Sequence, residues 1–138
     1  MFQMLKRILL IIISLFFSKI SLAEKVETCS HTKDRFNCVE YLKNYDGDTI
    51  TFNIPNVHPL IGKKISIRVN GVDTPEIRTK DQCEKTAART ARKLVGNLLK
   101  NAKRIDLVNI TRGKYFRVVA DVYMDGRNLR DILLNQRL

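Results

Sequence analysis

The sequence has 138 residues and a formal net charge of +11, from 25 Lys and Arg against 14 Asp and Glu. A chain of this length holds one domain, which excludes a long multidomain enzyme. The basic excess excludes an acidic, disordered, solvating protein. It indicates an anionic partner, which is a nucleic acid, an anionic membrane surface or an acidic protein.

Residues 1–23 have the pattern of a secretory signal peptide. Lys6 and Arg7 precede an apolar run that reaches Phe17, and small residues lead to a cleavage point after Ala23. The run is shorter than the roughly 20 residues of a membrane span, which argues against an uncleaved anchor. A buried helix fits least, because nothing polar marks an outer face. Cleavage would remove three cations and no acid, leaving 115 residues with a charge of +8. We therefore expect a secreted or periplasmic protein without stable membrane insertion.

The three cysteines, Cys29, Cys38 and Cys83, form no Cys-x-x-Cys pair, so a redox motif and a zinc knuckle have no support. Outside the cytosol a disulfide is expected. Cys38–Cys83 would tie the first strand to the start of a helix, whereas Cys29–Cys38 would staple the N-terminal arm. The sequence leaves all three pairings open.

The predicted domain spans residues 36–138 and follows a polar arm at residues 24–35. Apolar residues alternate from Phe36 and again from Ile50 to Ile54. The dipeptide Asp46-Gly47 between the two runs predicts a hairpin whose Gly tolerates a positive φ. The following elements are expected in this order: a loop (Pro55–Lys64), a strand (Ile65–Asn70), a polar loop (Asp73–Gln82), a helix (about Glu84–Asn101), two strands (Arg104–Ile110 and Tyr115–Tyr123) joined at Thr111–Lys114, a turn at Asp125-Gly126, and a short helix (Asn128–Gln136). The longer helix should bury Ala87, Ala91, Leu94, Val95, Leu98 and Ala102.

This order, β-β-β-α-β-β-α, is typical of a mainly β domain with helices, an α+β protein built as a five-stranded Greek-key barrel of the OB type. The open face of such barrels commonly binds oligonucleotides. A small mixed sheet with one covering helix is the alternative.

Acidic residues are scarce in this chain, and they gather at turns. Asp46 and Asp48 flank Gly47, Asp73 begins Asp-Thr-Pro-Glu, and Asp121 with Asp125 makes a weaker third group. Because strand ends gather at one rim of a small barrel, Asp48 and Asp73 are expected to converge. Paired carboxylates with a backbone carbonyl suit Ca²⁺. The two histidines, His31 and His58, lie outside any zinc-ligand spacing.

Three further residues complete a candidate site. Glu76 can take a proton from water. Arg68 and Arg117 can hold phosphate oxygens with planar forks and offset the charge that develops at phosphorus. Each feature alone is more often a turn, a loop or a solvated side chain, and their joint presence favours the functional interpretation.

Three segments resemble the staphylococcal nuclease (thermonuclease) family: Tyr45–Thr49, Arg68–Glu76 and Lys114–Arg117. The resemblance runs in order from about Phe36 to Leu138. It implies an OB-type barrel with a Ca²⁺-dependent phosphodiesterase that cleaves DNA and RNA and leaves 3′-phosphate products. The family pattern continues past the position of Leu138 with a tyrosine-bearing segment and a third helix, and we expect this chain to lack them. Its Pro55–Lys64 stretch is also longer than the type member's.

Carried over by position, the resemblance gives each candidate residue a role. Asp48, Asp73 and the Thr74 carbonyl would bind Ca²⁺, and Asp46 would orient metal-bound water. Glu76 would be the general base, Arg68 and Arg117 would clamp the scissile phosphate, and Tyr115 would contact a phosphate or the sugar.

The leading hypothesis is thus an exported, monomeric nuclease. A non-catalytic OB module that binds nucleic acid is the alternative; it predicts losses among the site residues, and none is lost. A cationic protein that binds surfaces explains the charge but not the acids.

Overall fold

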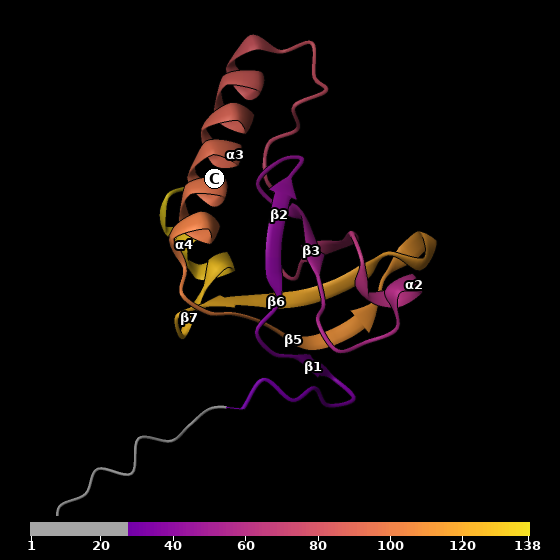
Figure 1. Ribbon diagram of the computed structural model, residues 1–138. Coiled ribbons are helices and arrows are strands. Elements are labelled where there is room, and N and C mark those ends of the chain that lie inside the picture. Colours follow the sequence, from indigo (N-terminus) through magenta and orange to yellow (C-terminus); the bar gives the residue numbers. More distant parts are fainter. Residues whose placement is uncertain (1–27) are drawn as a thin grey trace, which may run out of the picture.

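The computed structural model describes residues 28–138, so the predicted signal peptide and residues 24–27 of the arm lie outside it. Figure 1 shows the long helix α3 beside the β2–β3 hairpin, with α2 on the opposite side of the domain. The elements are β1 (Arg35–Phe36), β2 (Glu40–Asn44), β3 (Thr49–Asn53), α2 (Pro59–Gly62), β4 (Ile65–Val69), α3 (Gln82–Asn101), β5 (Ile105–Arg112), the 3₁₀ turn η2 (Lys114–Phe116), β6 (Val118–Met124), β7 (Arg127–Asn128) and α4 (Leu129–Asn135).

The strands form one mixed sheet in the order β1-β5-β6-β4-β3-β2, and β7 pairs with β6. β4 and β6 are parallel, and the other pairs are antiparallel. The predicted α+β class is confirmed, and the arrangement is consistent with an OB-type fold. The predicted first strand is split into β1 and β2, and β7 is an addition of two residues.

The two edge strands, β1 and β2, follow each other directly in the chain. No ladder joins them within residues 28–138, so backbone pairing does not close the sheet. Residues 37–39 cross from one edge to the other, and the Val39 N–H donates to the Ile105 carbonyl at 2.9 Å. The covalent chain itself therefore bridges the open seam.

The core lies where the predicted alternation placed it. Ile50 and Phe52 of β3 and Ile67 of β4 have no exposed surface, and Val69 is nearly as buried. Side chains on a strand alternate between faces, so these four point to the same side of the sheet. Leu129 and Leu133 of α4 are also fully buried.

The buried face of α3 is rotated from the predicted one. Ala88 and Leu99 are buried, whereas Ala87, Leu94 and Leu98 are only half-buried. The true centre of the face carries small residues, which let the helix approach the sheet closely. Their neighbour Gly96 also matters, because a Cβ there would lie 3.2 Å from the Asn44 amide oxygen.

Within residues 28–138, no helix combines the length and apolarity needed to cross a membrane.

Several predicted boundaries were wrong. The loop at residues 55–64 contains α2, which begins with a proline and is capped by His58, whose Nδ1 accepts from the Leu60 N–H. β5 extends to Arg112, and β6 begins only at Val118, because η2 occupies residues 114–116. The final helix agrees with the prediction, with Asn128 as its cap.

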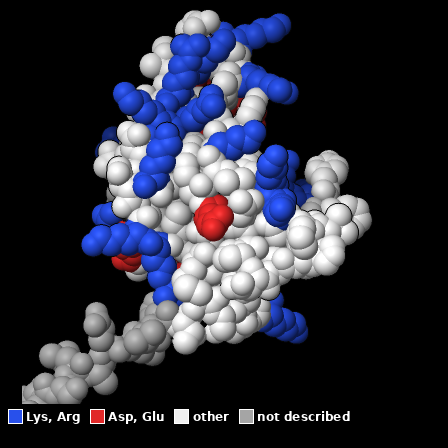
Figure 2. Space-filling view, viewed as in Figure 1, with Lys and Arg blue, Asp and Glu red and all other residues white. Residues whose placement is uncertain are grey.

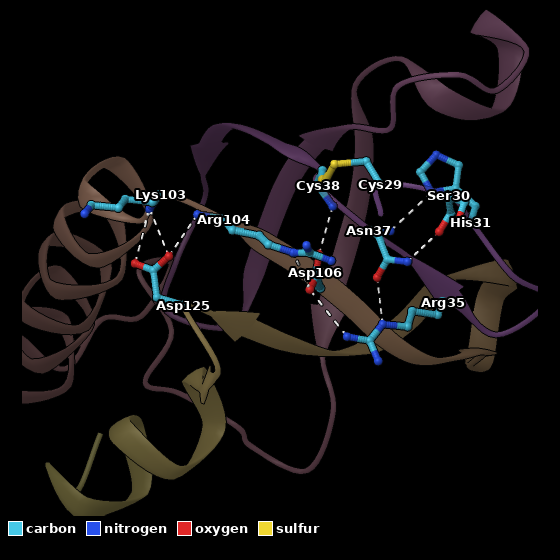
Figure 3. Close-up of polar contacts among 10 residues, drawn as sticks. All are labelled: Cys29, Ser30, His31, Arg35, Asn37, Cys38, Lys103, Arg104, Asp106 and Asp125. Carbon is cyan, nitrogen blue, oxygen red and sulfur yellow. Dashed lines mark hydrogen bonds and ion pairs between the residues drawn. A yellow bond between two sulfur atoms is a disulfide. The ribbon is translucent and has the colours of Figure 1, made fainter. Parts of the chain in front are cut away.

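The disulfide pairs Cys29 with Cys38 and so selects one of the three open possibilities (Figure 3). Next to it, the Cys38 N–H donates to Asp106 Oδ1 at 2.8 Å. Asp106 is buried on β5 and also accepts from Arg104 and Arg35. The bridge and this carboxylate together fasten the arm to the sheet edge. Cys83 is free and exposed at the start of α3.

We expect the Cys29→Ser/Cys38→Ser variant to lose about 2–3 kcal/mol of unfolding free energy, since the bridge closes a loop of about ten residues. Urea unfolding of the variant against the parent chain measures this loss. Cys83→Ser is the matched control and should change the midpoint little. Equal midpoints for all three chains would contradict an anchoring role for the bridge.

Candidate active site

The tip of the β2–β3 hairpin is held by Asp46. Its Oδ1 accepts from the backbone N–H groups of Asp48 and Thr49, at 3.2 and 2.7 Å. Such a carboxylate fixes a tight turn without help from other elements. The carboxyl group of Asp48 is thereby directed inward at the start of β3.

The predicted positive φ at Gly47 was wrong, because in the described chain only Gly71 and Gly126 are glycines with a positive φ. Gly47 is required instead because a side chain would not fit. A Cβ on Gly47 would lie 2.7 Å from Thr74 Cγ2 and 3.0 Å from the Ala91 Cβ. The turn therefore packs directly against the Asp73–Thr74 segment and α3. This close approach brings the two acidic turns together.

Asp48 and Asp73 converge on one guanidinium, as the sequence predicted for strand ends at one rim. Arg68 Nη2 lies 3.3 Å from Asp48 Oδ2 and 2.6 Å from Asp73 Oδ1. The Asp48 side chain is 3% exposed and that of Asp73 is 85% exposed, so the pair has a buried and a solvent-facing member. The Thr74 N–H donates to Asp48 Oδ2 at 3.0 Å.

Burial raises the pKa of Asp48 from 3.8 to about 6. The Thr74 N–H and the Arg68 guanidinium lower this pKa, and the neighbouring Asp46 carboxylate raises it. Burial has the largest effect because it removes water from the charged form. Near neutral pH the group is ionised, and it is then a buried anion that favours a nearby positive charge.

The donors fit a hard divalent cation. Asp48 and Asp73 supply carboxylate oxygens to the same point, now occupied by Arg68 Nη2. The neighbouring Thr74 Oγ1 packs against Gly47 and is buried without a hydrogen-bond partner in the described part of the chain. Among residues 28–138 no three His, Cys, Asp or Glu side chains gather in a metal-binding cluster. A cation at this point would therefore complete its shell with backbone carbonyl oxygen, such as that of Thr74, and with water.

Arg68 and Arg117 line the same small pocket, of about 290 Å³, with Tyr115 at its mouth. Arg68 comes from β4 and Arg117 from the residue before β6, and the parallel β4–β6 pairing sets them side by side. Tyr115 does not lie on a strand as predicted. It lies in η2 with a φ of 57° and is 91% exposed.

Phe116 is an exposed aromatic residue next to the site that sequence reasoning missed, although it does not line the Arg68–Arg117 pocket. It follows Tyr115 with a φ of 59° and is 83% exposed. Left-handed backbone is costly for residues other than glycine, and such strain is found at functional sites. The sequence offered only Gly113 as a turn signal, so nothing announced two aromatic rings displayed beside Arg117.

Glu76 lies on the loop that follows Asp73 and is exposed. Its backbone N–H donates to the Glu84 carboxylate at 3.5 Å, which holds the loop against the start of α3. Its side chain forms no hydrogen bond within residues 28–138 and does not line the Arg68–Arg117 pocket. On the same loop, the Arg78 guanidinium stacks over the Tyr45 ring, 5.6 Å from its centroid, a contact the sequence did not predict.

The third acidic group serves the fold. Asp121 accepts from the side chains of Asn70 and Asn109. Asp125 accepts from the backbone N–H groups of Lys103 and Arg104 (Figure 3). Asp121 thus joins β6 to β5 and to the segment after β4, and Asp125 fixes the link between α3 and β5.

Residues 66–138 match the family described as staphylococcal nuclease homologue, so this chain belongs to that family. The matched range contains Arg68, Asp73, Glu76 and Arg117, whereas Asp48 precedes it. The chain is also 35% identical over 96 residues to the protein named endonuclease YncB from Bacillus subtilis (strain 168). The match covers 67% of this chain and 42% of that relative. The resemblance predicted from the motifs is confirmed.

Proposed function

We propose that this chain is a Ca²⁺-dependent endonuclease that hydrolyses phosphodiester bonds in DNA, RNA or both. One observation carries the proposal: Arg68 joins the buried Asp48 to Asp73 beside a pocket that it shares with Arg117. Membership of the nuclease homologue family and a relative named as an endonuclease support it.

Asp48, Asp73 and the Thr74 carbonyl would hold the cation. When bound, Ca²⁺ would polarise a phosphoryl oxygen and a water molecule. Arg68 bridges the two carboxylates and also lines the pocket, where its guanidinium can hold phosphate oxygens. Asp46 uses Oδ1 to hold the turn, and its other carboxylate oxygen would orient a water molecule at the cation.

Arg68 and Arg117 together clamp the phosphate, as two planar forks from β4 and from the residue before β6. Water attacks phosphorus and Glu76 accepts its proton. The bond from phosphorus to the 5′-oxygen breaks, and that oxygen takes up a proton from solvent water. The products are a 3′-phosphate and a 5′-hydroxyl. The pair of guanidinium groups offsets the charge that grows on the phosphoryl oxygens. Tyr115 contacts the adjacent phosphate or sugar from the mouth of the pocket.

The test is cleavage of single-stranded DNA and of RNA by the purified chain, with Ca²⁺ and then with chelator. We expect cleavage with Ca²⁺, products with 3′-phosphate ends, and loss of cleavage on chelation. Circular dichroism establishes that the chain is folded in both conditions. Binding without cleavage by a folded, Ca²⁺-loaded chain would favour the non-catalytic module instead.

Export of the chain is part of the same proposal. The Cys29–Cys38 disulfide fits an oxidising compartment, and the basic, apolar and small-residue pattern of residues 1–23 fits a cleaved signal. The mass of the chain recovered from outside the cytosol tests it, because cleavage after Ala23 predicts an N-terminal Glu24.

A further inference from the structure

A second basic surface lies on the molecule, and the candidate active site does not use it. It is a groove of about 380 Å³ between β2 and α3. Five cations line this basic groove: Lys43 on β2 and Arg89, Arg92, Lys93 and Lys100 on α3. No acidic residue lines it. Figure 2 shows Lys and Arg side chains gathered over α3 with few acidic ones between them.

These five cations have no acidic partner within residues 28–138. Other guanidinium groups, at Arg35, Arg68 and Arg130, do form ion pairs. The lone acid of α3, Glu84, is at its first turn and accepts from Thr79 Oγ1 at 2.6 Å. The positive charge of the basic groove is therefore not neutralised by acids of the described chain.

The row of cations along α3 lowers the stability of the helix. Lys85, Arg89 and Lys93 are spaced four residues apart, and like charges at that spacing destabilise a helix. Lys85 also lies near the N-terminus, where the helix dipole disfavours a cation. A solvated face that served only solubility would mix the two signs of charge.

The length of the basic groove points to a polyanion. Arg89 and Lys100 are eleven residues apart on one helix, which corresponds to roughly 16 Å at 1.5 Å per residue. That span exceeds one phosphate group. The groove is concave, walled by a strand and a helix, and so suits a polymer chain better than a flat lipid surface.

A hydrogen-bond path joins the basic groove to the acidic turn. Asn44, which lines the groove, is buried, and its Nδ2 donates to the Asp46 carbonyl at 2.8 Å and to the Arg92 carbonyl at 2.9 Å. Asp46 in turn fixes the backbone of Asp48. The groove thus begins at the hairpin tip that carries the candidate metal ligand.

We propose that the basic groove binds the sugar-phosphate backbone of a nucleic-acid strand several nucleotides away from the phosphodiester that is cleaved. The inference rests on the proposed nuclease function for its ligand. The strand leaves the Arg68–Arg117 pocket, crosses the tip at Tyr45 and continues between β2 and α3. The groove then gives longer strands a higher affinity than short ones.

The test compares a groove variant, Arg89→Gln/Arg92→Gln/Lys93→Gln, with a control variant of equal charge, Lys33→Gln/Arg127→Gln/Arg137→Gln. The three control residues are exposed and lie outside the groove. Fluorescence anisotropy measures binding of an oligothymidylate of about 16 nucleotides, in chelator so that nothing is cleaved. The Arg92 carbonyl that Asn44 uses is unchanged by substitution of the side chain.

We expect the groove variant to bind about tenfold more weakly, and the slope of log affinity against log salt to fall by about 2, from three lost phosphate contacts. The control variant should lose less than about threefold in affinity. Lys43→Gln, on the opposite wall, should lower the slope by about 0.7. The thermal midpoint of the groove variant should be no lower than that of the parent chain, since like charges are removed.

Cleavage separates failure of this inference from failure of the proposed function. With Ca²⁺, the groove variant should keep its kcat/KM for the dinucleotide TpT, whereas its kcat/KM for the longer strand should fall about tenfold. If no substrate is cleaved, the proposed function fails, but the anisotropy measurement in chelator still shows whether the basic groove binds the oligonucleotide. Equal losses in the groove and control variants would overturn the inference, as would an effect confined to phosphatidylglycerol vesicles with oligonucleotide affinity unchanged.

Discussion

Arg117→Lys and Glu76→Gln are each expected to lower kcat on single-stranded DNA by about 10²–10³-fold. Lysine keeps the charge of Arg117 but loses the planar fork that holds two phosphoryl oxygens. Glutamine keeps the shape of Glu76 but cannot accept the proton of the attacking water. Both side chains are exposed, so the unfolding free energy should stay within about 0.5 kcal/mol of the parent value.

Steady-state kinetics at saturating Ca²⁺ measure the effect, with urea unfolding alongside. Arg127→Lys is the matched control, because Arg127 is an exposed guanidinium on β7 outside the pocket. A near-parental kcat in either variant would remove that residue from the role assigned to it.

Asp48→Asn is expected to separate function from stability. The rate of cleavage should fall by about 10³-fold, because the variant loses several kcal/mol of metal-dependent stabilisation of the transition state. Each 1.36 kcal/mol corresponds to a factor of about ten in rate. The unfolding free energy at pH 8 in chelator should rise by about 1–2 kcal/mol. Asparagine keeps an acceptor for the Thr74 N–H, and Arg68 keeps its ion pair with Asp73.

The sign of the stability change follows from the raised pKa of Asp48, which is about 6 in the fold and 3.8 as the ordinary value. Between these pH values the folded state holds the proton more tightly than the unfolded chain does. The contribution of Asp48 to stability is therefore greatest below pH 3.8 and is lost as the pH rises through about 6. The advantage of the asparagine variant should vanish near pH 3.5.

Urea unfolding in chelator at pH 8 and at pH 3.5 checks this pattern. An asparagine variant that is less stable than the parent chain at pH 8 would contradict it.

The same pKa has a consequence for the proposed metal site. Below about pH 6 a cation must displace the proton from Asp48, so its apparent affinity should fall about tenfold for each further pH unit.

The sequence predicted the parts of the site that depend on strand ends. The alternation in β3 and β4 set their buried faces, and both strands border acidic turns at the same rim. That is sufficient to bring Asp48, Asp73 and Arg68 together. The parallel pairing of β4 with β6 then brings in Arg117. The buried faces follow from periodicity, which a sequence records directly, whereas the β4–β6 pairing is a finding of the structure.

The remaining features depend on contacts between distant residues or on backbone strain. Position 47 requires a glycine because Thr74 and Ala91, from other elements, would clash with a Cβ there, and no local sequence pattern encodes that. The left-handed turn at Tyr115 and Phe116 opposes the local preference of aromatic residues for extended strands. The choice of Cys29 as the partner of Cys38 depends on how the arm lies against β5.

The open seam between β1 and β2 has a mechanical consequence. Tension applied to the chain before Cys29 passes through the disulfide to Cys38, and from there to β5 through Asp106. The arm is therefore restrained at the β1–β5 edge of the sheet before the chain enters the hairpin that carries Asp48. A pull on the arm would load the disulfide and the Asp106 hydrogen bond as well as the single covalent link into β2.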